Sequence, residues 1–137
     1  MLNLSCFCGR VRLDIQKRPD FINECNCTLC SKLGARWGYF HPSEVTVEGA
    51  TNGYYREDKA DAGAQFHFCA KCGSTTHFTM TPSAVAKYGG DTLLGINMWL
   101  AAERDLVGVE VRYPDGLAWP GEGDFGYVRA PRIIGQD

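Results

Sequence analysis

The residues best able to do chemistry in this chain are its seven cysteines, which lie in three tight clusters. They are spaced as C-x-C at Cys6 and Cys8, C-x-C-x2-C at Cys25, Cys27 and Cys30, and C-x2-C at Cys69 and Cys72. An odd number of cysteines cannot all form intramolecular disulfides, and neighbours this close in sequence are badly placed for disulfide geometry. Reduced thiols at these spacings are ligands that zinc prefers. The sequence therefore predicts metal sites.

Seven thiols divide into a set of four and a set of three. The outer pairs, Cys6/Cys8 and Cys69/Cys72, predict a closed structural zinc site with four thiolate ligands. The central triplet predicts a catalytic zinc site, which leaves one position for water or substrate. Alternatively, one of three histidines completes the triplet and closes the second site; these are His41, His67 and His77.

Alternation of apolar and polar residues predicts a mainly β fold that is stapled by zinc and has only short helical turns. We expect strands over 10–16, 21–22, 37–40, 45–47, 66–68, 75–80 and 94–98, a hairpin turn over 51–54, and helices over 82–88 and 100–105. Gly9 and Gly73 each follow a cysteine pair directly. They predict knuckle turns in which backbone amides approach the sulfur atoms.

The chain is the size of one domain, so we expect a single domain over residues 1–137. Its motif-bearing core covers about residues 3–100. The tail over about 113–137 is rich in glycine and proline and is expected to form loops. We expect this tail to pack on the body, or against a second subunit, through Trp119, Phe125 and Tyr127.

Charge and hydropathy exclude several classes of protein. The chain has 14 Lys+Arg against 16 Asp+Glu, a net charge of −2, and no basic cluster for a nucleic-acid backbone. No apolar run approaches the roughly 20 residues of a membrane span. The first residues do not resemble a signal peptide, so we expect a cytoplasmic protein with reduced thiols.

Three segments resemble the glutathione-dependent formaldehyde-activating (GFA) or CENP-V domain family. They are SCFCGRV over 5–11, CNCTLCSKLGA over 25–35 and FCAKCGS over 68–74, and the resemblance covers about residues 3–100. Two departures stand out. Asn26 replaces a histidine that is common in the family, and the stretch Gly95–Leu100 lacks the acidic residue that many members have there.

The resemblance implies the β-tent fold, a structural zinc on Cys6, Cys8, Cys69 and Cys72, and a catalytic zinc on Cys25, Cys27 and Cys30. It also implies a zinc-dependent carbon–sulfur lyase, similar to S-(hydroxymethyl)glutathione synthase. Such an enzyme holds two zinc ions per chain and adds a thiol, by default glutathione, to formaldehyde or a related small aldehyde.

Glutathione carries two carboxylates, so basic residues should flank its site. Lys32 and Arg36 are the nearest to the triplet in sequence and are the predicted contacts. Trp37, Tyr39 and Trp99 are candidates for the pocket wall. The expected partners are therefore a small thiol and an aldehyde, with neither nucleic acid nor membrane, and a homodimer is one assembly that the sequence allows.

Other readings use the same cysteines. A non-enzymatic zinc module of this fold would bind a protein partner, and a lyase for a different thiol adduct would use the same triplet. A zinc-containing methionine sulfoxide reductase would need a separate catalytic cysteine, and none is left over. A zinc-finger nucleic-acid binder is disfavoured by the net charge of −2.

Overall fold

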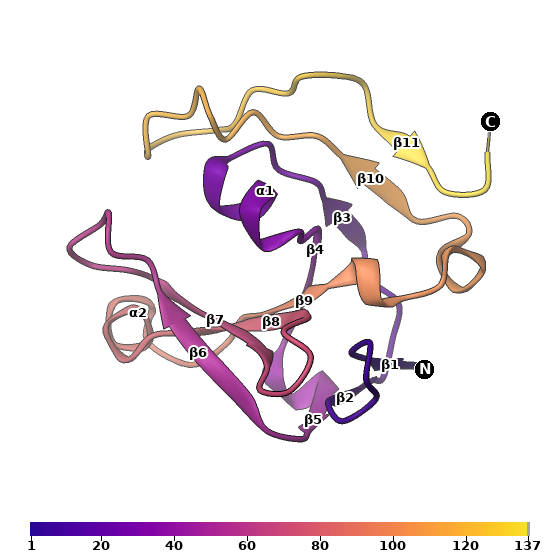
Figure 1. Cartoon of the computed structure of the whole chain (residues 1–137). Coiled ribbons are helices and arrows are strands. Elements are labelled where there is room, and N and C mark those ends of the chain that lie inside the picture. Colours follow the sequence, from indigo (N-terminus) through magenta and orange to yellow (C-terminus); the bar gives the residue numbers. More distant parts are fainter. Residues whose placement is uncertain (137) are drawn as a thin grey trace.

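The computed structural model describes residues 1–136 and is mainly β, as the alternation predicts (Figure 1). Asp137, the last residue of the predicted tail, lies outside the described residues. A three-stranded antiparallel sheet has the order β1–β2–β5, formed by β1 (Leu2–Ser5), β2 (Arg12–Ile15) and β5 (Val45–Glu48).

An eight-stranded sheet has the order β11–β10–β3–β4–β9–β8–β7–β6. Its strands are β3 (Phe21–Asn23), β4 (Trp37–Phe40), β6 (Thr51–Tyr55), β7 (Ala64–Cys69), β8 (Thr75–Met80), β9 (Leu94–Asn97), β10 (Glu110–Arg112) and β11 (Arg132–Ile133). Neighbours are antiparallel except β3 and β10, which are parallel. Strand β10, in the C-terminal part of the chain, thus lies beside β3, the strand that leads to the cysteine triplet.

The helical elements are short. They are α1 (Thr28–Leu33), α2 (Pro82–Tyr88) and three 3-10 turns, η1 (Pro42–Glu44), η2 (Met98–Leu100) and η3 (Glu103–Leu106). The predicted helix over 82–88 is confirmed as α2, where the Thr81 hydroxyl accepts a hydrogen bond from the Ala84 amide at 3.2 Å. The predicted helix over 100–105 is instead the two separate turns η2 and η3. Within residues 1–136 no helix combines the length and the hydropathy that crossing a bilayer requires.

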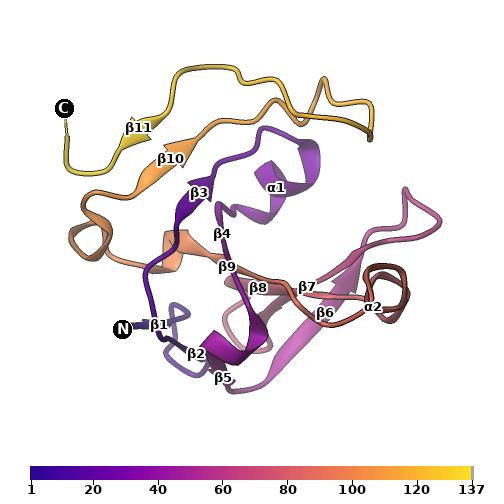
Figure 2. The same ribbon diagram turned by 180° about the vertical axis from the view of Figure 1, so that it is seen from behind.

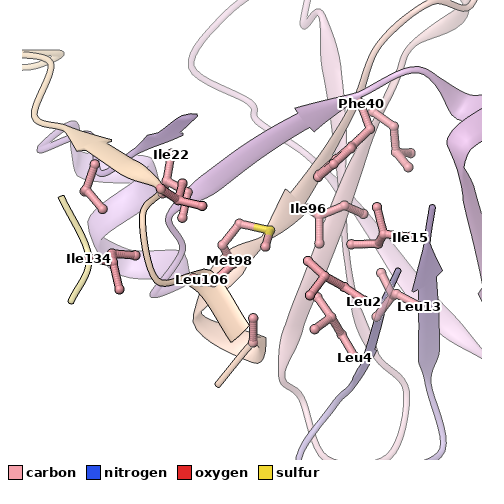
Figure 3. Close-up of a cluster of buried hydrophobic side chains, with 14 of the residues drawn as sticks. Leu2, Leu4, Leu13, Ile15, Ile22, Phe40, Ile96, Met98, Leu106 and Ile134 are labelled. Atoms are coloured by element: carbon pink, nitrogen blue, oxygen red, sulfur yellow. The ribbon is translucent and has the colours of Figure 1, made fainter. Parts of the chain in front are cut away.

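The main core lies where the two sheets meet (Figure 3). Leu13 and Ile15 from β2 face Ile96 from β9 and Met98 from η2, and all four are fully buried. Burying such a side chain stabilises the folded state by about 1.5–3 kcal/mol. A smaller apolar cluster of Ala35, Trp37 and Phe66 lies on the other face of β4, because successive side chains of a strand alternate between faces.

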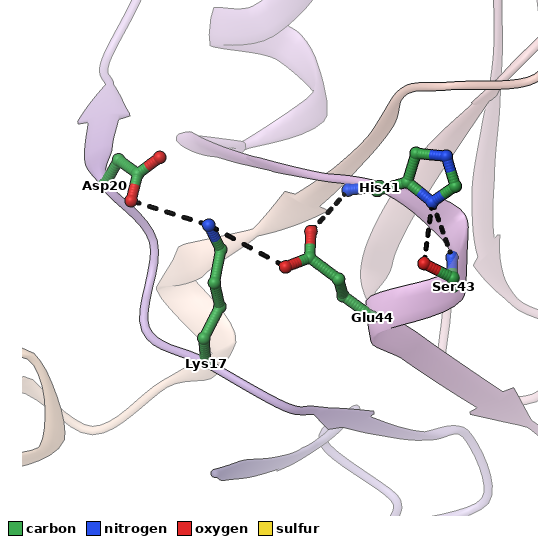
Figure 4. Close-up of polar contacts among 5 residues, drawn as sticks. All are labelled: Lys17, Asp20, His41, Ser43 and Glu44. Carbon is green, nitrogen blue, oxygen red and sulfur yellow. Dashed lines mark hydrogen bonds and ion pairs between the residues drawn. The ribbon is translucent and has the colours of Figure 1, made fainter.

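The chain passes from the large sheet to the small one at η1, between β4 and β5. His41 caps this turn (Figure 4): its Nδ1 accepts from the Ser43 amide at 3.1 Å, and its own amide donates to Glu44 Oε1 at 2.8 Å. Lys17 Nζ lies 3.6 Å from Asp20 and 3.7 Å from Glu44, so an exposed ion-pair network ties the turn to the loop after β2. His41 is therefore a capping residue.

The prediction of a hairpin turn over 51–54 is wrong. Residues Thr51–Tyr55 form β6, and the preceding β5 belongs to the other sheet, so no hairpin joins them. The chain instead changes direction at Gly49, whose φ is 107°. The Asn52-Gly53 pair that suggested a hairpin lies inside the β6–β7 ladder, where Gly53 pairs with His67.

Candidate metal centres

Four cysteine sulfurs converge between the two sheets. Cys6 and Cys8 follow β1, Cys69 ends β7, and Cys72 lies in the turn to β8. The four Sγ atoms all lie within 4.8 Å of one another, with Cys6 Sγ 3.6 Å from Cys8 Sγ and Cys8 Sγ 3.7 Å from Cys69 Sγ. A tetrahedral zinc ion with bonds of about 2.3 Å places its sulfurs about 3.8 Å apart. The spacing of this four-cysteine cluster therefore fits zinc.

Backbone amides surround these sulfurs, as the knuckle prediction requires. The Val11 amide lies 3.3 Å from Cys6 Sγ, and the amides of Lys71 and Cys72 each lie 3.4 Å from Cys69 Sγ. Such amides stabilise thiolates. Cys6 and Cys69 are only 3% and 1% exposed, so the cluster is closed to solvent on that side.

The turns themselves have the expected form. Gly9 and Gly73 have φ of 81° and 80°, in the left-handed region that favours glycine. The side chain of Ser74 lies 3.2 Å from Cys72 Sγ, and its hydrogen bond lowers the pKa of the Cys72 thiol to about 5. The Ser74 hydrogen bond favours the thiolate form that a metal ion needs.

The other three cysteines gather at α1. Cys25 follows β3, Cys27 is the N-cap of α1, and Cys30 lies in its first turn. Their Sγ atoms all lie within 4.8 Å of one another. The Cys30 amide donates to Cys27 Sγ at 3.3 Å, and the Cys27 amide donates to Cys25 Sγ at 3.4 Å. The sequence predicted no helix here, yet the third cysteine lies on one.

The thiols of this three-cysteine cluster share their protons unequally. Hydrogen bonds from Cys25 and then from Cys30 lower the pKa of the Cys27 thiol to about 2. Hydrogen bonds to Cys25 and then to Cys27 raise the pKa of Cys30, while the indole N–H of Trp37, 3.5 Å from Cys30 Sγ, acts in the opposite direction. Cys27 is thus the thiol of the three that ionises most readily. A soft divalent ion binds such a ligand set once the remaining protons leave.

The C-terminal segment 114–119 packs directly on this cluster. Asn26 Nδ2 donates to Asp115 Oδ1 at 2.9 Å, and the Leu117 amide donates to Asn26 Oδ1 at 3.0 Å. Between these two contacts lies Gly116, where an added Cβ would meet Cys25 Sγ at 2.4 Å. The tail therefore packs on the body, as one of the two expectations had it. Of the three aromatic residues expected to make the contact, Trp119 and Phe125 line a cavity beside the triplet, whereas Tyr127 is 58% exposed.

Two cavities border the three-cysteine cluster. The larger, of about 620 Å³, touches Cys27 and is lined by Lys32, Tyr54, Arg56 and Leu117, among others. The smaller, of about 280 Å³, touches all three cysteines and is walled by aromatic side chains, which are Trp37, Tyr39, Trp119 and Phe125. In both ribbon views α1 lies between the C-terminal segment and the loop joining β6 to β7 (Figures 1 and 2). These two segments supply about half of the lining residues.

Of the residues predicted around the triplet, Lys32, Trp37 and Tyr39 line these cavities. Trp99 lines a separate cavity of about 260 Å³ that touches Cys25 and Cys30. Arg36 lines none of the three. It is 1% exposed, with its guanidinium 3.8 Å from the Trp99 ring centroid, and burial lowers its pKa. Its side chain projects to the opposite side of the backbone from that of Trp37. Closeness to the triplet in sequence therefore does not bring Arg36 to these cavities.

Sequence reasoning missed Arg56 and Lys59, both in the loop between β6 and β7. Arg56 lines both cavities, and Lys59 lines the smaller one. The Arg56 guanidinium forms two hydrogen bonds of 2.7 Å with Asp58, and its charge helps to lower the pKa of Cys27. No motif marks these residues, because only the folding of β6 against β7 brings them to the cluster.

The histidines are placed elsewhere. His67 and His77 stack across β7 and β8, with ring centroids 4.3 Å apart and planes 4° apart. His67 also contacts the hydroxyls of Thr51 and Thr79. Among residues 1–136 neither group of potential metal ligands includes a histidine. The structure therefore does not support a histidine as fourth ligand of the triplet.

The protein thus combines a mainly β fold with two cysteine clusters. One is a closed set of four thiols, and the other is a set of three thiols that borders cavities. The family model described as glutathione-dependent formaldehyde-activating enzyme (GFA) matches residues 1–90. The match covers more than half of the chain, so this protein belongs to the GFA family, as its cysteine motifs predicted.

Among solved structures, a Rhodobacter sphaeroides protein aligns with a TM-score of 0.57 over 79% of this chain and 97% of that one, at 24% identity. At that identity the alignment shows a shared fold. No curated protein matches the chain.

Proposed function

We propose that this protein is a zinc-dependent carbon–sulfur lyase that adds a thiol to formaldehyde or a related small aldehyde and also catalyses the reverse reaction. Glutathione is the first candidate for the thiol. The observation that carries the proposal is the contrast between the clusters. Four thiols are enclosed by backbone amides, whereas Cys25, Cys27 and Cys30 face a cavity large enough for a ligand. Three protein ligands and an accessible position are typical of catalytic zinc.

Two zinc ions per chain fit the donor sets, because both consist of thiols and soft thiolates select zinc among the common divalent ions. Cys6, Cys8, Cys69 and Cys72 would hold the structural ion, and Cys25, Cys27 and Cys30 the catalytic one. Zinc held by Cys25, Cys27 and Cys30 would lower the pKa of a coordinated thiol, so that this thiol would be ionised at neutral pH.

The proposed reaction joins the thiol sulfur to the aldehyde carbon. The thiol gives up its proton, its sulfur bonds to the carbon, the carbonyl π electron pair moves to oxygen, and that oxygen takes up a proton in turn. The aromatic wall of the smaller cavity limits access of water to the reacting carbon. The side chains of Trp37 and Trp119 contribute to this wall.

Basic side chains around the cavities suit the carboxylates of glutathione. Lys32 lines the larger cavity, Lys59 the smaller, and Arg56 both. We propose that the peptide part of glutathione lies in the larger cavity, with its sulfur at the shared boundary beside Cys27. Arg56 replaces Arg36 as the proposed arginine contact, because it is the arginine that lines these cavities.

A lyase for another thiol adduct is the second candidate, and one observation favours it. The cavity beside the triplet has a volume of about 280 Å³ and four aromatic residues in its wall, far more than formaldehyde fills. For either substrate we propose a single cytoplasmic domain over residues 1–137, with small molecules as partners, no nucleic acid or membrane, and a homodimer as one assembly to examine.

The test is exchange spectroscopy with ¹³C-formaldehyde and glutathione at equilibrium. The zinc-loaded protein should accelerate exchange between free formaldehyde and its glutathione adduct, and Cys27→Ser should abolish the acceleration while the protein stays folded. Exchange at the uncatalysed rate in the wild type, or unchanged acceleration in Cys27→Ser, would refute the proposal.

A further inference from the structure

Tyr39 is held rigidly in the wall of the cavity beside the triplet. It lies on β4 two residues after Trp37, so both side chains project from the same face of the sheet. Its ring packs against Phe21 and Phe78, with centroids 5.8 Å and 6.3 Å away. Together with the three triplet cysteines it lines the cavity of about 280 Å³. The ring is therefore packed in place in the wall of the cavity that the triplet cysteines also line.

The hydrogen bonding of this phenol leaves its proton available. Asn23 Nδ2 donates to Tyr39 Oη at 3.1 Å, so the oxygen already acts as an acceptor. Within residues 1–136 no acceptor for the Tyr39 proton is found. Asn23 lines the same cavity. A phenol that accepts from one side keeps its own O–H as a donor, here in a cavity wall.

We propose that Tyr39 is a catalytic residue whose hydroxyl donates a hydrogen bond to the aldehyde oxygen, and that Asn23 is the positioning residue that orients it. This inference rests on the proposed function. As the sulfur–carbon bond forms, the carbonyl electron pair becomes negative charge on that oxygen, and a preorganised donor stabilises the charge most where water is excluded. Tyr39 keeps its proton, and the oxygen of the product is protonated from water.

Kinetics of three variants test the role. Tyr39→Phe should lower kcat/KM for adduct formation by about 10²-fold, the effect typical of losing one such donor. Asn23→Asp should have a similar effect, because a carboxylate has only acceptors and would capture the Tyr39 proton. Tyr88→Phe is the matched control, since Tyr88 is 67% exposed at the end of α2. Glutathione affinity, measured from cobalt–thiolate absorption, should stay unchanged in all three.

Ligand binding gives a readout that does not depend on turnover. The wild type should bind S-(2-hydroxyethyl)glutathione about tenfold more tightly than S-ethylglutathione, because only the former offers a hydroxyl to Tyr39. Tyr39→Phe and Asn23→Asp should lose this preference, and Tyr88→Phe should keep it.

The outcomes separate the two ideas. If the wild type accelerates the reaction and Tyr39→Phe stays within twofold of it, the role of Tyr39 is refuted while the proposed function stands. If the wild type shows no acceleration, the proposed function fails. In that case, ligand binding alone decides whether Tyr39 donates to a ligand. A preference for S-(2-hydroxyethyl)glutathione that is lost in Tyr39→Phe would support that role, and the absence of a preference in the wild type would refute it.

Discussion

The two cysteine clusters of this protein contain the same donor atom but are built in opposite ways. The four-cysteine cluster joins segments more than 60 residues apart in sequence, and its Cys8 and Cys69 sulfurs meet between the sheets. The three-cysteine cluster is local, with Cys25, Cys27 and Cys30 on one short segment. A cluster assembled from distant segments can hold the fold together, whereas a local cluster leaves one side free for a ligand.

The strand pair β6–β7 connects the two clusters. Cys69, at the end of β7, pairs with Thr51, and the far end of β6 leads to Arg56 in the wall of both cavities. The five paired positions of β6 separate the Cys69 end of the ladder from Arg56, a distance of about 17 Å along the strand. A metal ion at the closed cluster would therefore anchor one end of the strand pair whose other end carries the loop bordering the open cluster.

Removing one ligand from each cluster should separate structural from functional roles, with the largest effect in the closed cluster. A structural zinc site contributes about 10–16 kcal/mol of apparent binding free energy, comparable with the whole stability of a domain. We expect Cys69→Ala to abolish cooperative folding. Cys27→Ala should stay folded and lose one metal ion.

Circular dichroism and metal content per chain measure both effects. Equal loss of folding in the two variants would contradict the division into a structural and a functional cluster.

Acid should weaken the β7–β8 pair that carries half of the closed cluster. Burial, and then the charge of His67, lowers the pKa of His77 from 6.5 to about 4. The unfolded chain then binds the proton more readily, so the free energy of unfolding is fully retained above pH 6.5 and falls as the pH drops towards 4. The loss should reach at most about 3 kcal/mol.

Urea titrations of the wild type and His77→Asn between pH 7 and pH 4 isolate this effect, because thiol protonation is common to both proteins. A difference in stability that does not change with pH would rule out the contribution of His77.

A methyl group at Gly116 should disturb only the open cluster. An added Cβ would lie 2.4 Å from Cys25 Sγ and 2.9 Å from Cys27 Cβ, so the sulfur must move. We expect Gly116→Ala to weaken metal binding at the triplet by about 10–100-fold, the range for changes next to metal ligands.

Gly126→Ala is the matched control, because an added Cβ there meets nothing within 4 Å. Competition with a colorimetric chelator measures both affinities. Equal affinities would show that the tail does not restrain the triplet.

The smallest effect should come from Asn26, which joins the tail to the triplet. Asn26→Ala removes its hydrogen bonds to Asp115 and to the Leu117 amide. Loss of such a bond should raise hydrogen exchange at the Leu117 amide by about tenfold, while metal remains bound. Mass spectrometry of the 114–119 peptide gives the measurement, and exchange as slow as in the wild type would show that other contacts hold the tail.

The parts of the fold that sequence could predict are those encoded locally. The knuckle turns at Gly9 and Gly73 and the helix over 82–88 depend on neighbouring residues. Helix α1 was missed because it has only six residues and begins at a cysteine, which is not a typical cap.

Contacts between distant segments could not be predicted, apart from the joining of the two outer cysteine pairs. Asn26 and Asp115 are 89 residues apart, and Arg56 reaches the triplet only through the β6–β7 ladder. Arg36 was chosen because it is near the triplet in sequence, but its side chain is buried against the ring of Trp99 and lines none of the cavities at the triplet. Residues that touch a ligand often come from distant loops, which a single sequence does not place.

Cobalt substitution tests the central claim most directly, since thiolate–cobalt absorption reports on both clusters at once. The account predicts two cobalt ions per chain and a saturable change in absorption as glutathione is added, with the change lost in Cys27→Ser and unaffected by S-methylglutathione. Two ions with no change on adding glutathione would contradict an open, thiol-accepting cluster, and one ion per chain would contradict the division of the seven cysteines into four and three.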